Sequence, residues 1–217
     1  MIRLVTVPCV EFNLARLIAA ISEAHPDRVA LVHKSKQISF PTFVERYRRF
    51  GSALNASGLS CRVERSELEG HMSGQDHVAL FLNNECEYLE SMLGAWAGRV
   101  ASFNVNHRYI ADELHYLLTD ADAKAVVVNS MYAPNLAEVL PQLPNLGLIV
   151  QVPDESGNGL LPGAIYYEDF LREQEPRDLD DCSPDDLYLL YTGGTTGMPK
   201  GVLWRNADFF VGALGGL

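Results

Sequence analysis

Apolar residues recur at helical spacing in two segments near the start of the chain. The first, 13–26, reads NLARLIAAISEAHP, with Asn13 as a suitable N-cap and Pro26 as a stop signal. The second begins near Pro41, which suits the first turn of a helix, and ends near Gly58. The predicted buried faces are Leu14, Leu17, Ile18 and Ile21 in the first helix and Phe43, Tyr47, Phe50 and Leu54 in the second. Between them, VALVH and ISF flank the polar turn KSKQ, which predicts a strand hairpin.

Strands and helices alternate through the rest of the chain. The runs HVALFL, VASFNV, KAVVVN, LGLIVQV and LYLLY predict strands, and ADELHYLLTDA, APNLAEVLPQ and YYEDFLRE predict helices between them. A further helix is predicted to start at Asn83 or Asn84 as N-cap, with a core face of Tyr88, Leu89, Met92, Leu93 and Trp96. This alternation predicts an α/β fold with a Rossmann-like, mostly parallel sheet flanked by helices. Such sheets place ligand-binding loops at the carboxyl ends of their strands.

Three segments lack a sustained periodic pattern of apolar residues. Residues 59–76 are polar and contain glycine, which predicts a loop or an insertion. Residues 153–165 are rich in Gly and Pro and predict a second loop. The acidic stretch RDLDDCSPDD, 177–186, is predicted to be a solvated connector that leads into the strand LYLLY.

Composition narrows the function classes. The 217 residues include 17 basic and 28 acidic side chains, for a net charge of −11. This balance argues against general nucleic-acid binding, because affinity for a phosphate backbone comes mainly from Lys and Arg. The charge balance does not exclude binding of a single nucleotide, which needs only one local cation and a few hydrogen-bond donors. The four cysteines, Cys9, Cys61, Cys86 and Cys182, form no CxxC pair and predict structural thiols. With no signal peptide and no run of 18 apolar residues, we expect a cytoplasmic protein without a transmembrane segment, and peripheral membrane contact stays open.

The segment 192–201, TGGTTGMPKG, combines three features that hold a polyphosphate. Its glycines let the backbone approach a ligand closely, its threonine hydroxyls and backbone N–H groups donate hydrogen bonds, and its lysine supplies a positive charge. The candidate phosphate-binding residues are Thr192, Gly193, Gly194, Thr195, Thr196, Gly197 and Lys200. The order is neither that of the Walker A motif nor that of GxGxxG. Composition alone favours a plain turn.

The full string, YTGGTTGMPKG over 191–201, resembles the signature of the adenylate-forming superfamily, commonly written YTSGTTGxPKG. Nine of the ten comparable positions agree, and Gly193 stands where the common pattern has serine. The TGG form resembles bacterial, particularly actinobacterial, fatty-acid and sterol-type acyl-CoA synthetases. The segments 12–54 and 76–128 resemble the opening elements and the first Rossmann-like units of that superfamily.

The resemblance implies a reaction in two steps. A carboxylate attacks the α-phosphate of ATP to give an acyl-adenylate and pyrophosphate, and the thiol of CoA then displaces AMP to give a thioester. It implies that 192–197 hold the β- and γ-phosphates with help from Lys200, and that Thr195 or Thr196 contacts Mg²⁺. ATP, Mg²⁺, CoA and a small carboxylic acid, of fatty or sterol type, are the implied ligands. The resemblance assigns no catalytic residue to this chain.

Other side chains are weaker candidates. His107 and Arg108, in NVNHRY, follow a strand end, and an exposed pair is favoured over a cleft lining. His33, His71, His77 and His115 lack carboxylates or cysteines at metal-ligand spacing, so no metal is assigned to them. Trp96 and Trp204 are predicted to be core residues rather than nucleotide contacts.

The motifs that the superfamily carries after this signature do not follow Gly201 here. The expectation is that residues 1–217 form the N-terminal part of an AMP-binding domain and cannot complete adenylation by themselves. The alternative is a non-catalytic module that binds a nucleotide or a partner through exposed apolar surface, with a homodimer as one form.

Overall fold

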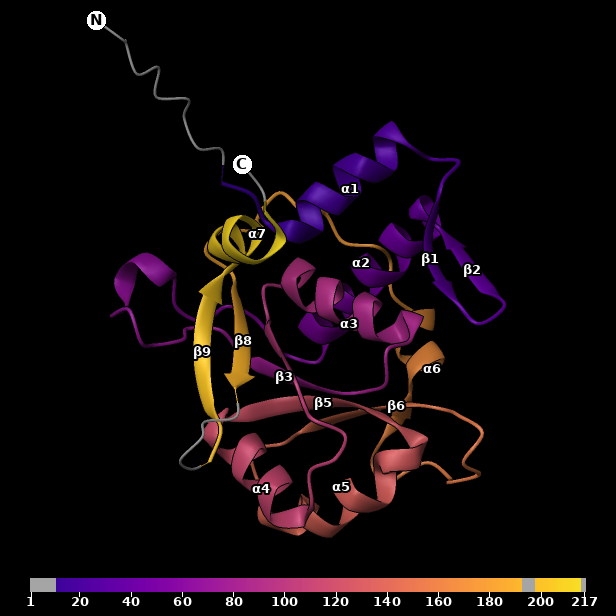
Figure 1. The fold of residues 1–217 in the computed structure, drawn as a ribbon, viewed down its shortest axis with the longest axis vertical. Helices are drawn as coiled ribbons and strands as arrows, with labels where there is room; N and C mark the ends of the chain where they lie inside the picture. The colour runs from indigo at the N-terminus through magenta and orange to yellow at the C-terminus, as the bar shows by residue number, and fades with distance from the viewer. Residues whose placement is uncertain (1–10, 193–197, 216–217) are drawn as a thin grey trace, which may run out of the picture.

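The computed structural model describes residues 11–192 and 198–215 as a sheet with helices on both faces (Figure 1). The elements and their bounds, in chain order, are α1 (Leu14–Ala24), β1 (Val29–His33), β2 (Lys36–Ser39), α2 (Phe40–Ala56), η1 (Arg65–Glu67), β3 (His77–Phe81), α3 (Cys86–Ala97), β4 (Ala101–Asn104), α4 (Ala111–Asp120), β5 (Ala123–Asn129), η2 (Ser130–Tyr132), α5 (Ala133–Val139), η3 (Leu140–Gln142), β6 (Leu148–Val152), β7 (Ile165–Tyr166), α6 (Tyr167–Arg172), β8 (Leu187–Thr192), β9 (Lys200–Arg205) and α7 (Asn206–Leu214).

The main sheet has seven strands in the order β7-β6-β5-β3-β4-β8-β9. Neighbouring strands are parallel except for β8 and β9, which form an antiparallel pair. Val78 and Leu80 of β3 belong to one buried cluster, and Ala79 and Phe81 belong to the other. Both faces of the strand are therefore covered, which is why its sequence is a continuous apolar run. The predicted fold class is confirmed.

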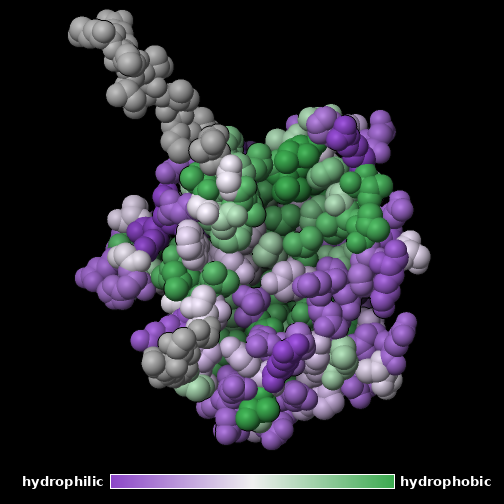
Figure 2. All heavy atoms as spheres, viewed as in Figure 1, coloured by the Kyte–Doolittle hydropathy of each residue, from purple (hydrophilic) through white to green (hydrophobic). Residues whose placement is uncertain are grey.

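Two layers of helices enclose this sheet. Leu114 and Leu117 of α4 and Leu136 of α5 pack on one face. Helices α2, α3 and α6 cover the other face, and α1 and the β1–β2 hairpin lie beyond α2 and α3 (Figure 1). In the same view, apolar residues gather around α1, α3 and α7, whereas hydrophilic residues cover α4 and α5 (Figure 2). Val211 and Leu214 are exposed on α7.

The first helix and the hairpin form as predicted. The Asn13 side chain accepts hydrogen bonds from Ala15 N at 2.9 Å and from Arg16 N at 3.4 Å, which caps α1. The predicted caps of α3 are wrong, because this helix begins at Cys86 and Glu85 occupies the N-cap position. The Asn83 side chain instead accepts a hydrogen bond from the Tyr132 hydroxyl at 2.6 Å. On the predicted core face of α3, Leu93 and Trp96 are buried, while Tyr88, Leu89 and Met92 are half-buried.

The acidic connector differs from the prediction at its carboxyl end. Asp178, Asp180 and Asp181 are exposed as predicted, but Cys182 is buried and Asp186 is only 1% exposed. The buried carboxylate of Asp186 is surrounded by hydrogen-bond donors, three from other parts of the chain and one, Ser183 N, from the connector itself. The short edge strand β7 also went unpredicted: Ile165 lies in the predicted loop and Tyr166 in the predicted helix YYEDFLRE.

Among the described residues, no helix combines the length and the apolar character needed to cross a bilayer. Cys61, Cys86 and Cys182 are free thiols, and Cys9 lies outside the described residues.

Helices α2 and α3 approach closely at glycines. A Cβ atom built on Gly94 would lie 2.7 Å from the Tyr47 carbonyl oxygen and 2.8 Å from the Phe50 Cβ atom. Substitution of Gly94 with Ala is therefore expected to lower the free energy of unfolding by about 1–3 kcal/mol, because the two helices must separate. Chemical denaturation checks this value. The matched control is Gly147→Ala, since a Cβ atom there meets nothing within 4 Å. Equal losses in both variants would contradict the close approach.

Candidate functional site

The described residues of the signature lie at the end of β8 and the start of β9, which pair as antiparallel neighbours. Thr192 pairs with Lys200, and Tyr191 pairs with Gly201, so the hydroxyl and the ammonium predicted to bind phosphate come from directly opposite positions. Both Thr192 and Lys200 are exposed. The other predicted phosphate-binding residues, Gly193, Gly194, Thr195, Thr196 and Gly197, lie outside the described residues. This group includes both predicted Mg²⁺ contacts.

Helix α4 holds both sides of this hairpin end. The Tyr191 hydroxyl donates a hydrogen bond to the Asp120 carboxylate at 2.8 Å. The Tyr116 hydroxyl donates a hydrogen bond to the Pro199 carbonyl oxygen at 3.2 Å. Burial and the hydrogen bond to Asp120 raise the pKa of Tyr191, so this phenol stays protonated and remains a donor. The segment between Tyr191 and Pro199 is therefore anchored at both ends by one helix.

The two ends of the signature also pack on each other. A Cβ atom built on Gly201 would lie 2.9 Å from the Tyr191 Cζ atom and 3.1 Å from its hydroxyl oxygen. The Tyr191 ring also packs on Phe103, with ring centroids 5.8 Å apart, so it has little room to move. Gly201 is thus required by the neighbouring ring, a reason that the sequence alone does not reveal.

A cavity of about 600 Å³ lies beside this hairpin end. It opens where β3, β4 and β8 end, at the point where the chain passes from β4 on one side of β3 to β5 on the other. This position is a topological switch point, where open parallel sheets bind ligands. The lining residues are Leu82, Asn84, Tyr88, Asn104, Val105, Asn106, His107, Tyr109, Glu113, Tyr191, Met198 and Pro199.

Contacts between residues that follow the strand ends lie near this cavity. Asn83 N donates a hydrogen bond to the Asn129 side chain at 2.7 Å, which links the end of β3 to the end of β5. The His107 ring stacks on Tyr132, with centroids 6.0 Å apart. His107 and Arg108 are exposed as predicted, yet His107 also lines the cavity. Asn84 and Asn104 went unpredicted as cavity residues, and the signal that identifies them is their place at strand ends.

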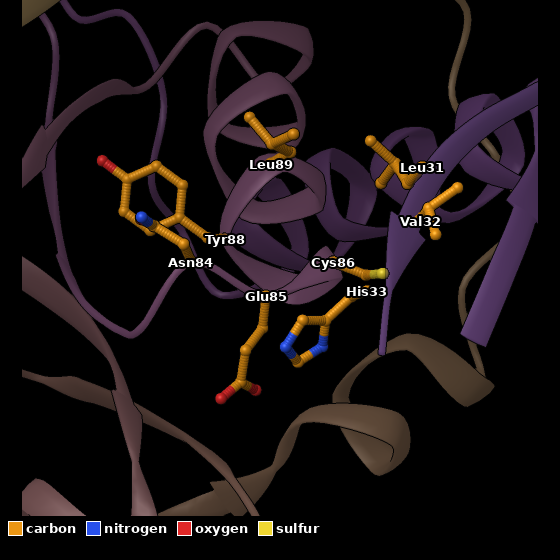
Figure 3. A pocket seen from close by; sticks show the side chains of 8 residues that line it. All are labelled: Leu31, Val32, His33, Asn84, Glu85, Cys86, Tyr88 and Leu89. Carbon is orange, nitrogen blue, oxygen red and sulfur yellow. The ribbon is translucent and has the colours of Figure 1, made fainter. Parts of the chain in front are cut away.

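A second, smaller cavity of about 280 Å³ lies between β1 and the start of α3 (Figure 3). Leu31, Val32 and His33 line it from β1, and it is lined from the other side by Asn84, Glu85, Cys86, Tyr88 and Leu89 (Figure 3). Asn84 and Tyr88 line both cavities, so the two adjoin. Within 11–192 and 198–215, no group of three or more His, Cys, Asp or Glu residues is arranged to hold a metal ion.

Trp96 lies in the core as predicted, whereas Trp204 packs against the edge of a core cluster. Trp96 is 1% exposed and packs on Tyr188, with ring centroids 5.8 Å apart. Trp204 is half-buried and packs on Phe209, with ring centroids 6.4 Å apart.

Comparison with known proteins matches residues 18–215 to the family described as AMP-binding enzyme. Over 207 residues the chain is 47% identical to the medium-chain acyl-CoA ligase Mig of Mycobacterium avium, a match that covers 94% of this chain and 38% of the relative. Over 198 residues it is 34% identical to the 3-oxocholest-4-en-26-oate–CoA ligase of Rhodococcus rhodochrous, covering 90% of this chain and 33% of the relative. The chain thus spans well under half the length of these relatives, whose names confirm the resemblance to fatty-acid and sterol-type ligases.

Solved structures share the fold. An anthranilate CoA ligase in complex with anthranoyl-AMP superposes with a TM-score of 0.81 at 21% identity, over 98% of this chain and 38% of that one. The N-terminal domain of FACL13 from Mycobacterium tuberculosis superposes with a TM-score of 0.69 at 23% identity, over 89% of this chain and 44% of that one.

The contact between Tyr191 and Gly201 gives a testable prediction. Substitution of Gly201 with Ala is expected to lower the free energy of unfolding by about 1–3 kcal/mol, because the added methyl group displaces a ring that Phe103 and Asp120 hold in place. In a Tyr191→Ala background, the same substitution should cost nothing further. Denaturation of the four proteins in this cycle measures the coupling. An equal cost of Gly201→Ala in both backgrounds would rule out the ring as the cause.

Proposed function

The chain belongs to the AMP-binding enzyme family, and we propose that it supplies the phosphate-binding part of an enzyme that converts a carboxylic acid to an acyl-CoA. In the first step, a carboxylate oxygen attacks the α-phosphorus of ATP and the bond to pyrophosphate breaks. In the second step, the sulfur of CoA attacks the acyl carbonyl carbon, AMP leaves, and the thiol proton is released. As in the sequence-based expectation, residues 1–217 form the N-terminal part of the AMP-binding domain.

One observation carries this proposal. Thr192 and Lys200 of the signature lie opposite each other where β8 ends and β9 begins, beside a cavity at the carboxyl ends of parallel strands. A hydroxyl donor and an ammonium at that position fit the terminal phosphates of ATP, since the ammonium offsets their charge and the hydroxyl donates to their oxygens. The backbone N–H groups of 193–197 complete the proposed phosphate site, in a segment that glycines allow to approach a ligand closely.

The proposed work of these residues is positioning. Tyr116 holds the Pro199 carbonyl and Asp120 holds Tyr191, so the ends of the loop have fixed places before ATP binds. Fixed donors around a phosphate cost little reorganisation during the reaction. The proposed Mg²⁺, near Thr195 or Thr196, neutralises part of the phosphate charge when it is bound. The relatives' names support a medium-chain, long-chain or sterol-type acid as the acyl substrate.

A second candidate function is a non-catalytic module that binds a nucleotide or associates with a partner, including a second copy. The exposed apolar side chains of α7, with Val211 47% and Leu214 59% exposed, favour it because contiguous apolar surface promotes association. Exchange of radiolabelled pyrophosphate into ATP separates the two, since only an adenylating enzyme shows exchange that depends on an added acid.

We predict that Lys200→Ala weakens the binding of Mg·ATP to the 217-residue chain about tenfold, because one direct charge interaction with the phosphates is lost. Isothermal titration calorimetry measures the dissociation constant. The matched control is Lys124→Ala, which removes a lysine paired with Asp122 at the start of β5 and should leave the affinity unchanged. A similar affinity for wild type and Lys200→Ala would refute the phosphate role of Lys200.

The proposed reaction is tested in a chimera. In it, this chain replaces the matched segment of the Mycobacterium avium ligase, to which it is 47% identical. We predict acid-dependent pyrophosphate exchange by the chimera and a loss of at least about tenfold when it carries Lys200→Ala. The same assay on the 217-residue chain should show no exchange above its own Lys200→Ala variant. A chimera that folds and binds ATP but shows no acid-dependent exchange would favour the binding-module function.

A further inference from the structure

A carboxylate is buried at the base of the hairpin, opposite the end that carries the signature. Asp186 directly precedes β8 and is 1% exposed, although the sequence around it is acidic and polar. Burying an ionised carboxylate is costly unless donors surround it. In the described part of the chain, Asp186 and Glu90 are the two carboxylates that are buried, and only Asp186 adjoins the hairpin.

Four donors converge on the two oxygens of Asp186. The Oδ1 atom accepts hydrogen bonds from Gln75 Nε2 at 3.1 Å and from Arg99 Nε at 3.0 Å. The Oδ2 atom accepts from Ser183 N at 2.8 Å and from Asn13 Nδ2 at 3.1 Å. Each oxygen thus has two donors, an arrangement that only an ionised carboxylate satisfies, because an amide or a protonated acid would present a hydrogen to one of these donors.

The same network holds the backbone at the base of the hairpin. Gln75 Oε1 accepts a hydrogen bond from Leu187 N, the first residue of β8, at 2.7 Å. Asn206, which follows the last residue of β9, donates to the Asp186 carbonyl oxygen from its backbone N and its side-chain Nδ2, both at 2.9 Å. Asn206 Oδ1 in turn accepts from Leu14 N at 3.0 Å. Both strands are therefore tied at their base to α1 and to the segment before β3.

Arg99 extends the network to the turn between α3 and β4. Its backbone has φ of 55°, a left-handed conformation that non-glycine residues rarely adopt. Its guanidinium also binds Glu64 through two hydrogen bonds, at 2.7 and 2.9 Å. An unusual backbone conformation that persists in a well-bonded residue indicates that its surroundings determine it. The turn is held in this form while Arg99 reaches Asp186.

We propose that Asp186 positions Thr192 and Lys200, and that its network fixes the base of the β8–β9 hairpin so that these two residues meet the cavity in one orientation. Six residues of strand span about 20 Å, so a small tilt at the base moves Thr192 and Lys200 by an amount that matters for hydrogen bonds. Helix α4 steadies the far end through Tyr116 and Asp120, and the Asp186 network steadies the near end. That Thr192 and Lys200 bind the phosphates of ATP rests on the proposed function.

The test compares the two buried carboxylates. Glu90 pairs with Arg46 at 2.8 Å and accepts from the Tyr167 hydroxyl at 3.1 Å, contacts that join α3 to α2 and α6 and do not include the hairpin. Asp186→Asn is the test variant and Glu90→Gln is its matched control. Asn206→Ala is a second test variant that leaves the Asp186 carboxylate in place and frees the β9 side of the base. Burial raises the pKa of Asp186 to about 6, so the measurements are made at pH 8, where the wild-type carboxylate is ionised.

Hydrogen–deuterium exchange of the 217-residue chain is the first readout. In Asp186→Asn and Asn206→Ala, amides of β8 and β9 should exchange about tenfold faster, while amides of α2 and α6 keep the wild-type rate. In Glu90→Gln, amides of α2 and α6 should exchange about tenfold faster, while amides of β8 and β9 keep the wild-type rate. The second readout is the dissociation constant for Mg·ATP, which should rise about tenfold in the two test variants and stay unchanged in Glu90→Gln.

The proposal is overturned if amides of β8 and β9 keep the wild-type exchange rate in the two test variants. It is also overturned if the amides of all elements exchange faster together, because uniformly faster exchange indicates a loss of global stability alone. It is also overturned if Glu90→Gln weakens ATP binding as much as Asp186→Asn does. If Asp186→Asn does not fold, Asn206→Ala decides by the same criteria. A wild-type chain that binds no Mg·ATP counts against the proposed function, and the hairpin exchange rates still decide whether Asp186 holds the hairpin.

Discussion

The buried carboxylate of Asp186 is the interaction on which the rest of the arrangement depends. A charge with 1% exposure is tolerated only because four donors surround it, and these donors come from α1, from the segment before β3, from the turn after α3 and from the connector itself. The carboxylate therefore joins elements that the order of the chain keeps far apart. Removing it would leave Gln75, Asn13 and Ser183 N without their acceptor in a buried setting. The free energy lost in this way exceeds the net free energy that the same hydrogen bonds contribute when they are formed.

The sheet carries this local constraint to the site. Strand β8 pairs in parallel with β4, and β4 pairs with β3, so the carboxyl ends of three strands open at one edge. The cavity lies at that edge, and the hairpin brings the signature to it. Helix α4 then fixes both ends of the signature loop through Tyr191 and Pro199. The β8–β9 hairpin is thus held at its base by a buried charge and beside Thr192 and Lys200 by two tyrosine hydroxyls.

Much of this fold could be predicted from local sequence. Asn13 and its apolar repeat define α1, and the run HVALFL defines β3, because in both cases the local preference agrees with the burial pattern. The signature could also be identified, since the order of its residues is far more specific than their composition. The cap of α3 was predicted wrongly because the Asn83 side chain bonds Tyr132, which lies 49 residues later. The buried state of Asp186 could not be predicted, because nothing in an acidic run indicates which carboxylate meets donors, and Asn13 is 173 residues away. The reason for Gly201 also needs the structure, since the Tyr191 ring contacts it only after β8 and β9 pair.

A crystal structure of the 217-residue chain with Mg·ATP would show where the phosphates bind relative to the hairpin. We predict that the β- and γ-phosphates lie within hydrogen-bond distance of the Thr192 hydroxyl and the Lys200 ammonium, with the rest of the nucleotide in the cavity lined by Asn104 and His107. We also predict that the Asp186 network keeps the hydrogen bonds described above when ATP is bound. Phosphates bound away from Thr192 and Lys200 would refute the phosphate site, and a hairpin that changes its base contacts on binding would refute the role of Asp186.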